Sequence, residues 1–375
     1  MPDEYVEVKR TGWGQNIIKS ISGIIIGFLM FIISFVVLWT NEGRTNLGKV
    51  AETALIVSPD AINSSADGKL VSITGTLETT TPIGDPEFLK PGKYVRLERI
   101  VEMFAWVEEK ETKTEKKVGG TTEEKTVYRY KKEWTRNPKS SGEFKYPEGH
   151  ENPYKSVSEQ TFYAPSAKIG IYSFDPQSAT LPSARPVYLT TQNVIFSRNG
   201  KLVGTDYIFI GKGTFDNPQV GDIRLRFEAV QTGISVTLFG KKQGENIIAY
   251  LHKGRDRLFR ALSGTREEAI ATLKTEHKMI GWFLRIVGFL LMWIGLNLIL
   301  GPIGAILDIL PFLGNLSRGI IGVITFLVAL VLSIVTILIS MIFHNLVALI
   351  IFIIVVVALI FLLRRRKRPV PSTTA

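Results

Sequence analysis

Residues 319–363 read GIIGVITFLVALVLSIVTILISMIFHNLVALIIFIIVVVALIFLL, a run of 45 residues without a charged side chain. As one α-helix, this run would measure roughly 67 Å, twice the thickness of the hydrocarbon layer of a bilayer. It must therefore fold back on itself. His344 and Asn345 form its only polar pair, so the sequence predicts two transmembrane spans, at 319–342 and 346–363, with a tight turn between them.

Two more segments are long and apolar enough to cross a membrane. From Ile21 to Trp39 there are 19 residues without a charge, and we predict a span at 17–39. A cleaved signal peptide is the alternative, but its apolar core would be shorter and small residues would follow it, whereas Trp39 suits an interfacial anchor. The next span is predicted at 281–300, where Arg285 lies near one end and can extend to the membrane surface.

The connection 301–318, between the second and third spans, is too short to cross a membrane. Its apolar residues recur at helical spacing: Ile303, Ile306, Leu307 and Leu310. This pattern is typical of a short helix that lies in the membrane surface. A loop that carries some apolar residues is the alternative.

Basic residues beside the spans indicate the orientation of the chain. Residues 364–368, at the start of the tail 364–375, read Arg-Arg-Arg-Lys-Arg. Basic residues next to a span stay on the cytoplasmic side, and Lys9, Arg10 and Lys19 before the first span agree with the tail. The basic run is also compatible with a nuclear-localisation signal or a patch for anionic lipids.

Four spans place both termini on one face of the membrane. We therefore expect the N-terminal arm 1–16, the connection 301–318 and the tail on the cytoplasmic or nucleoplasmic side. The segment 40–280 then lies on the opposite face, which is the lumen of the endoplasmic reticulum and the perinuclear space in a eukaryote or the periplasm in a bacterium.

The segment 40–280 is long enough to have its own hydrophobic core, and its dominant period is two. Alternate positions of one stretch are apolar: Val95, Leu97, Val101, Met103, Ala105 and Val107. This alternation predicts half-buried strands, here a long hairpin at 94–136 with a charged tip at 108–125. A helix is predicted from Asp256 to Lys278, running into the second span. Further strands are predicted at 69–79, 168–174, 187–196, 202–210, 222–230, 233–239 and 246–251.

The predicted fold is thus an α-helical multi-pass membrane protein of four spans, with a large, mainly-β extramembrane domain inserted between spans 1 and 2. The net charge of +11 and the pI of about 9.6 point at first to a nucleic-acid partner. Residues 40–280, however, hold 35 basic and 30 acidic residues, a difference of +5, and the short tail supplies another +5. The positive charge of the tail therefore indicates on which side of the membrane the tail lies, and no nucleic-acid binding is expected.

Catalytic motifs are missing from the sequence. It has no Walker A spacing, no His-Glu-x-x-His, no Gly-x-Ser-x-Gly and no dinucleotide fingerprint, and the absence of cysteine excludes thiolate chemistry and disulfides. Gly211-Lys212-Gly213 is a weak candidate for a phosphate loop. The first residues to inspect for hidden chemistry are His150, Glu151 and Asp222, and His150 fits a hydrogen-bonded loop histidine better than a general base. We expect no catalytic, cofactor-binding or metal-binding residues and no cofactor.

Polar residues in or near the spans give little support for transport. The candidates are Arg285, Asn297, His344 and Asn345, and three of the four lie nearer a predicted membrane surface than its centre. Transporters usually hold ionisable groups near the midplane. Asn297 fits a hydrogen bond between helices better.

Several stretches, taken in order, resemble the transmembrane protein 43 family, also called LUMA, and its bacterial relatives. They are WTNEGR at 39–44, VSPDAIN at 57–63, RIVEMFAWVE at 99–108, YRYKKEW at 128–134, GHENP at 149–153, VGDIRLR at 220–226, and the segment from Gly281-Trp282 to Gly295-Leu296-Asn297. The resemblance covers about residues 35 to 363. The compact termini and the lack of cysteine favour a bacterial member.

The resemblance implies a multi-pass membrane protein with a large domain between its first two spans and without an established enzyme activity. In animals it implies residence in the endoplasmic reticulum and inner nuclear membrane, self-association, and organisation of the envelope with emerin and lamins; in a bacterium those two partners do not apply. We expect a non-enzymatic scaffold that contacts membrane lipids, copies of itself and other membrane proteins. The alternatives are a membrane-anchored enzyme or protease accessory factor, and a protein that handles lipids or small solutes.

Overall fold

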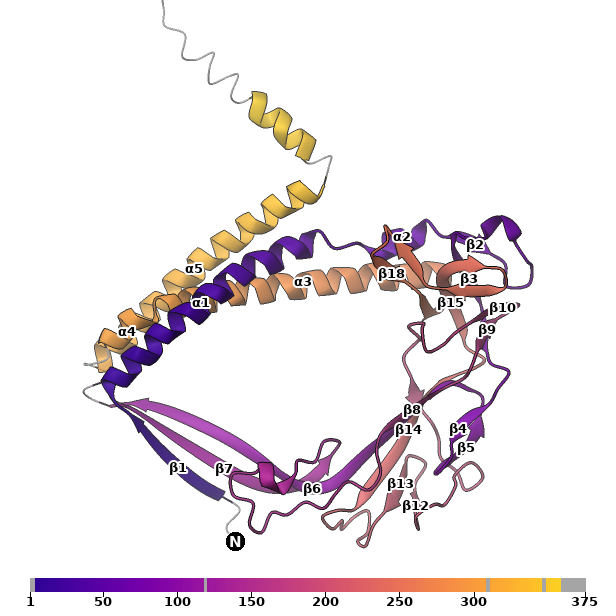
Figure 1. The fold of residues 1–375 in the computed structure, drawn as a ribbon, viewed down its shortest axis with the longest axis horizontal. Coiled ribbons are helices and arrows are strands. Elements are labelled where there is room, and N and C mark those ends of the chain that lie inside the picture. The colour runs from indigo at the N-terminus through magenta and orange to yellow at the C-terminus, as the bar shows by residue number, and fades with distance from the viewer. Residues whose placement is uncertain (1–3, 118–119, 308–310, 346–348, 359–375) are drawn as a thin grey trace, which may run out of the picture. The chain divides into compact units, whose positions relative to one another are not determined.

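The computed structural model describes residues 4–117, 120–307, 311–345 and 349–358 (Figure 1). The chain divides into two compact units. The β-rich unit holds Asn46–Lys113, Lys125–Glu276 and the N-terminal residues up to Glu7. The helical unit holds Val8–Thr45, Thr114–Glu124 and the described residues from His277 onward.

Among the described residues, three helices are long and apolar enough to cross a membrane. They are α1 (Trp13–Glu42), α3 (Arg266–Ile299) and α5 (Pro311–His344). Each corresponds to one of the first three predicted spans. α5 ends at His344, where the sequence predicts the turn. A shorter apolar helix follows at Leu349–Ala358, and the rest of the predicted fourth span lies outside the described residues.

The connection between the second and third spans is shorter than predicted. Its first seven residues form helix α4 (Gly301–Leu307), which favours the short helix over the loop. α5 begins at Pro311 rather than near Gly319. The prediction began the span after Arg318, the last charge before the apolar run, but a helix continues beyond its apolar part wherever its backbone stays hydrogen-bonded.

Small residues let the helices of the helical unit approach closely. A Cβ atom added to Gly27 of α1 would lie 2.7 Å from the carbonyl oxygen of Gly295 in α3, and one added to Gly295 would lie 2.7 Å from that of Gly27. Such contacts between small residues are the usual basis of helix association in membranes, where apolar burial gives no driving force. Leu38, Met292 and Ala329 form the buried centre of this packing.

Two larger sheets build the β-rich unit (Figure 1). The first has the order β1-β7-β6-β14-β13-β12, with β11 paired to β14 and β8 paired to β6. Its strands are β1 (Glu4–Thr11), β6 (Tyr94–Lys116), β7 (Thr122–Thr135), β8 (Gln160–Tyr163), β11 (Arg185–Pro186), β12 (Lys201–Val203), β13 (Tyr207–Ile210) and β14 (Ile223–Gln231).

The second sheet has the order β19-β15-β16-β10-β9-β3-β2, and β15 also pairs with β3. Its strands are β2 (Leu55–Val57), β3 (Leu70–Glu78), β9 (Ala167–Ile169), β10 (Tyr172–Phe174), β15 (Ser235–Gln243), β16 (Asn246–Ile248) and β19 (Arg260–Ser263).

Smaller elements complete the unit. Two short pairs are β4 (Ile83–Asp85) with β5 (Leu89–Gly92), and β17 (Tyr250–His252) with β18 (Asp256–Leu258); helix α2 spans Leu47–Glu52, and 3₁₀ turns lie at Ser64–Ala66 and Ser141–Glu143. Each large sheet has its own cluster of buried side chains. Phe88 and Phe227 belong to the cluster of the first sheet, and Tyr172 to that of the second.

The predicted hairpin at 94–136 is confirmed as β6 and β7. Its alternating apolar side chains are buried from Val95 to Ala105 and partly buried at Val107, and Val101 of β6 lies opposite Leu225 of β14. The strand predicted at 187–196 is wrong. Val187 and Leu189 are buried there, but their N–H groups bond singly to Phe227 and Thr205, so no strand ladder forms. A buried loop thus produced the same alternation as a strand.

The helix predicted from Asp256 begins ten residues later. β18 and β19 occupy the first part of the predicted range, and α3 starts at Arg266. The backbone N–H of Thr265 donates to Glu268, while the N–H of Glu268 donates to the hydroxyl of Thr265, at 2.8 and 3.3 Å. This reciprocal pair is a capping box, which satisfies donors that a helix start leaves free. The predicted continuation of this helix into the second span is confirmed.

Residues 4–11, which the sequence prediction assigned to an arm outside the β-rich domain, form strand β1 next to β7 (Figure 1). Tyr5 stacks on Tyr146 with ring centroids 4.2 Å apart, and Arg129 donates to Glu4 at 2.9 Å. The edge of β7 offers backbone partners that a free arm would lack. The N-terminal arm is therefore part of the sheet as far as Thr11.

Candidate functional site in the helical unit

Polar side chains at the C-terminal end of α1 join it to α3. Arg285 donates two hydrogen bonds of 2.8 Å to the two carboxylate oxygens of Glu42. The carboxylate is nearly buried, with 8% of the side chain exposed, and the Arg285 guanidinium lies 5.0 Å from the ring centre of Trp282. A two-point contact of this kind fixes orientation as well as distance.

Two side chains beside Glu42 extend this contact. The Asn41 amide donates to the carbonyl oxygen of Gly281 at 3.1 Å, and Arg44 donates to that of His277 at 2.8 Å. Bonds from residues 41–44 thus reach three successive turns of α3. We call Asn41, Glu42, Arg44 and Arg285 the polar clamp; it fixes the register between α1 and α3.

α5 joins the same end of α1 through its last turn. The Ser340 hydroxyl donates to the carbonyl oxygen of Trp39 at 2.9 Å. The His344 ring lies 5.5 Å from the Trp39 ring, and a Cβ atom at Gly43 would come within 2.5 Å of its Nε2 atom. His344, the polar residue expected to mark the turn after α5, therefore also packs closely against Gly43.

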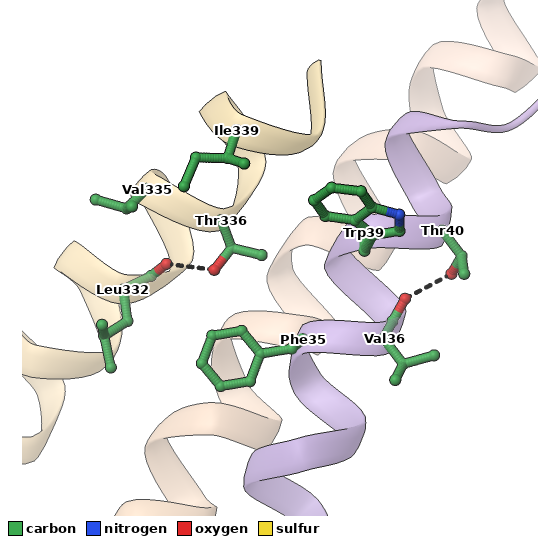
Figure 2. Close-up of a pocket in the computed structure, with 8 residues that line it drawn as sticks. All are labelled: Phe35, Val36, Trp39, Thr40, Leu332, Val335, Thr336 and Ile339. Atoms are coloured by element: carbon green, nitrogen blue, oxygen red, sulfur yellow. Dashed lines mark hydrogen bonds between the residues drawn. The ribbon is translucent and has the colours of Figure 1, made fainter. Parts of the chain in front are cut away.

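An apolar groove of about 490 Å³ lies between α1 and α5 (Figure 2). Its lining comprises Phe35, Val36, Trp39, Thr40, Leu332, Val335, Thr336 and Ile339. The Thr40 hydroxyl donates to Val36 O and the Thr336 hydroxyl to Leu332 O, each at 2.7 Å (Figure 2). Because both hydroxyls are satisfied within their own helices, the groove fits an apolar occupant rather than a polar solute.

His150, the first candidate for acid–base chemistry, is packed among aromatic rings of the β-rich unit. Only 1% of it is exposed. Its ring stacks on Tyr130 at 4.0 Å and meets the edge of Trp106 at 4.7 Å, and its Nδ1 lies 3.1 Å from the carbonyl oxygen of Tyr146. This histidine supports the fold of its loop. The Glu151 carboxylate accepts from the backbone N–H of Gly149, and such backbone bonds lower its pKa.

Asp222 explains the glycines of the candidate phosphate loop. Its buried carboxylate accepts hydrogen bonds from the N–H groups of Lys212, Gly213 and Gln219, at 2.9, 3.1 and 2.7 Å. A Cβ atom at Gly211 would lie 2.1 Å from this carboxylate. The loop thus turns its N–H groups toward an anion of its own chain, in the place a phosphate would take.

The sequence reasoning missed a buried ion pair in the same unit. Arg99 donates to Asp85 at 2.8 Å, and both side chains are almost completely buried. The signal was present, because Arg99 occupies an inward position of the alternation between Leu97 and Val101. A charge at such a position needs a buried partner. The pair holds β4 against β6 and faces no cavity that we identify among the described residues.

The missed contact in the helical unit was also within reach of the sequence. Glu42 ends the first apolar segment and Arg285 begins the second, and antiparallel neighbouring spans bring these two ends together.

Among the described residues, no group of three or more His, Asp or Glu side chains could hold a metal ion.

Comparison with known proteins gives the family. The sequence profile of the family Transmembrane protein 43 matches residues 103–346. The chain belongs to this family. Transmembrane protein 43 of Rattus norvegicus is 29% identical over 91% of this chain and 90% of its own length. The human protein of that name is 27% identical with the same coverage, and the Transmembrane protein 43 homolog of Drosophila melanogaster is 24% identical over 72% of this chain and 74% of its own.

The comparisons confirm the resemblance drawn from the sequence and identify an integral membrane protein of the transmembrane protein 43 family. No solved structure matches the chain. The matched residues include the hairpin from Met103 onward, Asp222 with its loop, Arg285 of the polar clamp and the α5 side of the groove. The family therefore shares the region that contains most of the contacts described above.

Proposed function

We propose that the protein is a non-enzymatic membrane scaffold, which associates with copies of itself and with other membrane proteins. The observation that carries this proposal is the exposed apolar surface of the helices. Ile25 and Leu29 of α1 and Val323 and Leu327 of α5 are each more than half exposed. Lipid chains or helices of neighbouring proteins must cover them. The chemically active side chains, in contrast, bond within the fold.

Self-association is tested on full-length protein extracted with its surrounding lipid. Mass photometry is expected to give particles with more than one 41.8 kDa chain. Tryptophan introduced singly at Ile25, Leu29, Val323 and Leu327 then locates the contact, because a bulkier side chain reduces association only where two copies touch. Leu38→Trp is the matched control for lost folding, since Leu38 is fully buried within the unit. Monomers under all conditions, with no neighbours captured by crosslinking in native membranes, would remove the proposal.

The proposed orientation keeps the basic tail in the cytoplasm and the β-rich domain on the opposite face of the membrane, in the endoplasmic reticulum and inner nuclear membrane of a eukaryote or the inner membrane of a bacterium. We propose that 346–363 forms the fourth span. For residues 4–11 two arguments disagree: the basic residues Lys9 and Arg10 favour the cytoplasm, whereas pairing of β1 with β7 favours the face of the domain. Reporters fused after Ala375 and within the hairpin tip test the orientation.

Handling of lipid is the second candidate function, and the apolar groove favours it. The groove lies between helices whose outer surfaces are apolar, so an acyl chain could enter it from the bilayer. Mass spectrometry of lipids that remain bound after extraction tests this function. Thr336→Trp fills the groove and should displace a bound lipid, whereas Val323→Trp on the exposed face should not. The enzyme or protease-accessory alternative has no comparable support among the described residues.

A further inference from the structure

The groove between α1 and α5 lies close to the end of α5. Its α5 wall runs from Leu332 to Ile339, and the helix ends at His344. Residues 332, 335, 336 and 339 share one face of α5, as the helical period requires. Any segment that leaves α5 at His344 and turns back along this face therefore passes over the groove within its first few turns.

The next helix has the composition that such a groove requires. Leu349–Ala358 contains no polar side chain, and seven of its ten residues are isoleucine or valine. Side chains all around it are exposed, from 37% at Val356 to 60% at Ile354 and Val357. Isoleucine and valine have few rotamers to lose on packing. An apolar helix exposed on every side is complementary to an apolar groove whose hydroxyl groups are already hydrogen-bonded.

The lengths also match. Residues 345–348 lie between the last residue of α5 and Leu349, a length within the range of roughly 2–8 residues that joins neighbouring antiparallel helices. The N–H of Leu349 donates to the carbonyl oxygen of Asn345 at 2.8 Å. Because both helices rise equally per residue, His344 and Leu349 are level in an antiparallel pair. Ile339 is then level with Ile354, and Thr336 with Val357.

We propose that Leu349–Ala358 folds back antiparallel to α5 and occupies the groove between α1 and α5. The proposal names the contact surface of the fourth span and does not depend on the scaffold function. Packing in the membrane gains from close contact rather than from expelled water, and the groove supplies a shaped surface on both α1 and α5. A second copy of the chain and a lipid chain are the competing occupants.

The natural chain has no cysteine, so any disulfide or labelled thiol in a variant comes from the engineered cysteine pair. The double variant Thr336→Cys/Val357→Cys is oxidised in native membranes. A disulfide needs Cα atoms within about 7 Å, so seating of the helix is expected to give an internal disulfide and loss of maleimide labelling at monomer size. The pair Ile339→Cys/Ile354→Cys repeats the test one turn nearer the bend, in case the first variant folds poorly.

The matched control is Ile334→Cys/Val357→Cys, since Ile334 is 48% exposed and lies outside the groove. It should keep both thiols reactive. Coexpression of the single variants, each with its own tag, detects contacts between copies. A disulfide-linked dimer from these single variants would assign the groove to a second copy. Free thiols in both double variants would also overturn the proposal, and a copurified lipid lost in Thr336→Trp would then identify the occupant.

Discussion

Arg10 and Glu123 are 113 residues apart in sequence, yet Arg10 Nε lies 2.9 Å from a carboxylate oxygen of Glu123. The pair is largely exposed on the arginine side and adds little stability. Its importance is positional. The Asn16 amide, in the first turn of α1, also donates to Gly120 O and to the Thr122 hydroxyl, at 3.0 and 2.8 Å. The tip of the hairpin therefore lies at the N-terminal end of α1.

This contact bears on the membrane topology. The hairpin around its tip is rich in Glu and Lys, which cannot lie in hydrocarbon without a large cost. The tip and the start of α1 must therefore share one aqueous face. The basic residues before α1 predict instead that its start and the segment 40–280 lie on opposite faces.

The double variant Arg10→Cys/Glu123→Cys decides between these two arrangements. We expect an internal disulfide in native membranes, and labelling of both single variants by an impermeant maleimide from the same side. α1 would then begin on the face of the hairpin, where the segment 43–280 also follows its end, so α1 would not cross the membrane as the four-span arrangement proposes. Labelling from opposite sides without a disulfide would instead support both termini in the cytoplasm. Arg10→Cys/Thr40→Cys is the matched control for random oxidation, since Thr40 lies near the opposite end of α1 in the same unit, roughly 40 Å from its start.

Removal of one partner of the polar clamp should destabilise the helical unit. Glu42→Ala leaves Arg285 without its carboxylate in a largely apolar setting. We expect a loss of about 2 kcal/mol, below the range for fully buried pairs because Arg285 is partly exposed. Thermal unfolding in lipid particles measures it. The swap Glu42→Arg/Arg285→Glu should recover part of the loss, and Lys113→Ala, at an exposed pair, should change little. Equal melting of Glu42→Ala and the natural chain would show that the clamp fixes no register.

Substitution of Asp222 tests whether its carboxylate has a structural or a catalytic role. Asp222→Ala removes the acceptor of three backbone N–H groups, so we expect about 2 kcal/mol of lost stability in the β-rich unit and faster proteolysis within 211–219. Asp216→Ala, at an exposed position of the same loop, is the control and should have little effect. Unchanged proteolysis in Asp222→Ala would leave the buried carboxylate free for another role.

The sequence predicted the elements that depend on local pattern. Three apolar helices, the hairpin of β6 and β7 and the end of α5 at His344 follow from the period and length of their side-chain patterns. Contacts between distant residues needed the structure. Nothing at Gly27 or Gly295 indicates that their backbones come close, since glycine leaves no periodic signal. The groove is likewise lined by residues of two helices that lie far apart in the sequence. Gly211 and Gly213 gave a weak phosphate-loop candidate because their true partner, Asp222, follows eleven and nine residues later.

The buried phenol of Tyr130 gives the β-rich unit a dependence on alkaline pH. Burial, together with its hydrogen bond to the Glu108 carboxylate, raises the pKa of Tyr130 from 10.0 to about 12. The folded state thus holds the proton more tightly than the unfolded chain does. Its stabilising contribution is complete below pH 10 and disappears as the pH rises from 10 toward 12. Ultraviolet titration of phenolate formation should show a transition near pH 12 that is missing in Tyr130→Phe. Tyr154→Phe, at an exposed tyrosine, is the control and should leave this late transition in place. An unchanged late transition in Tyr130→Phe would assign the shifted phenol to another residue.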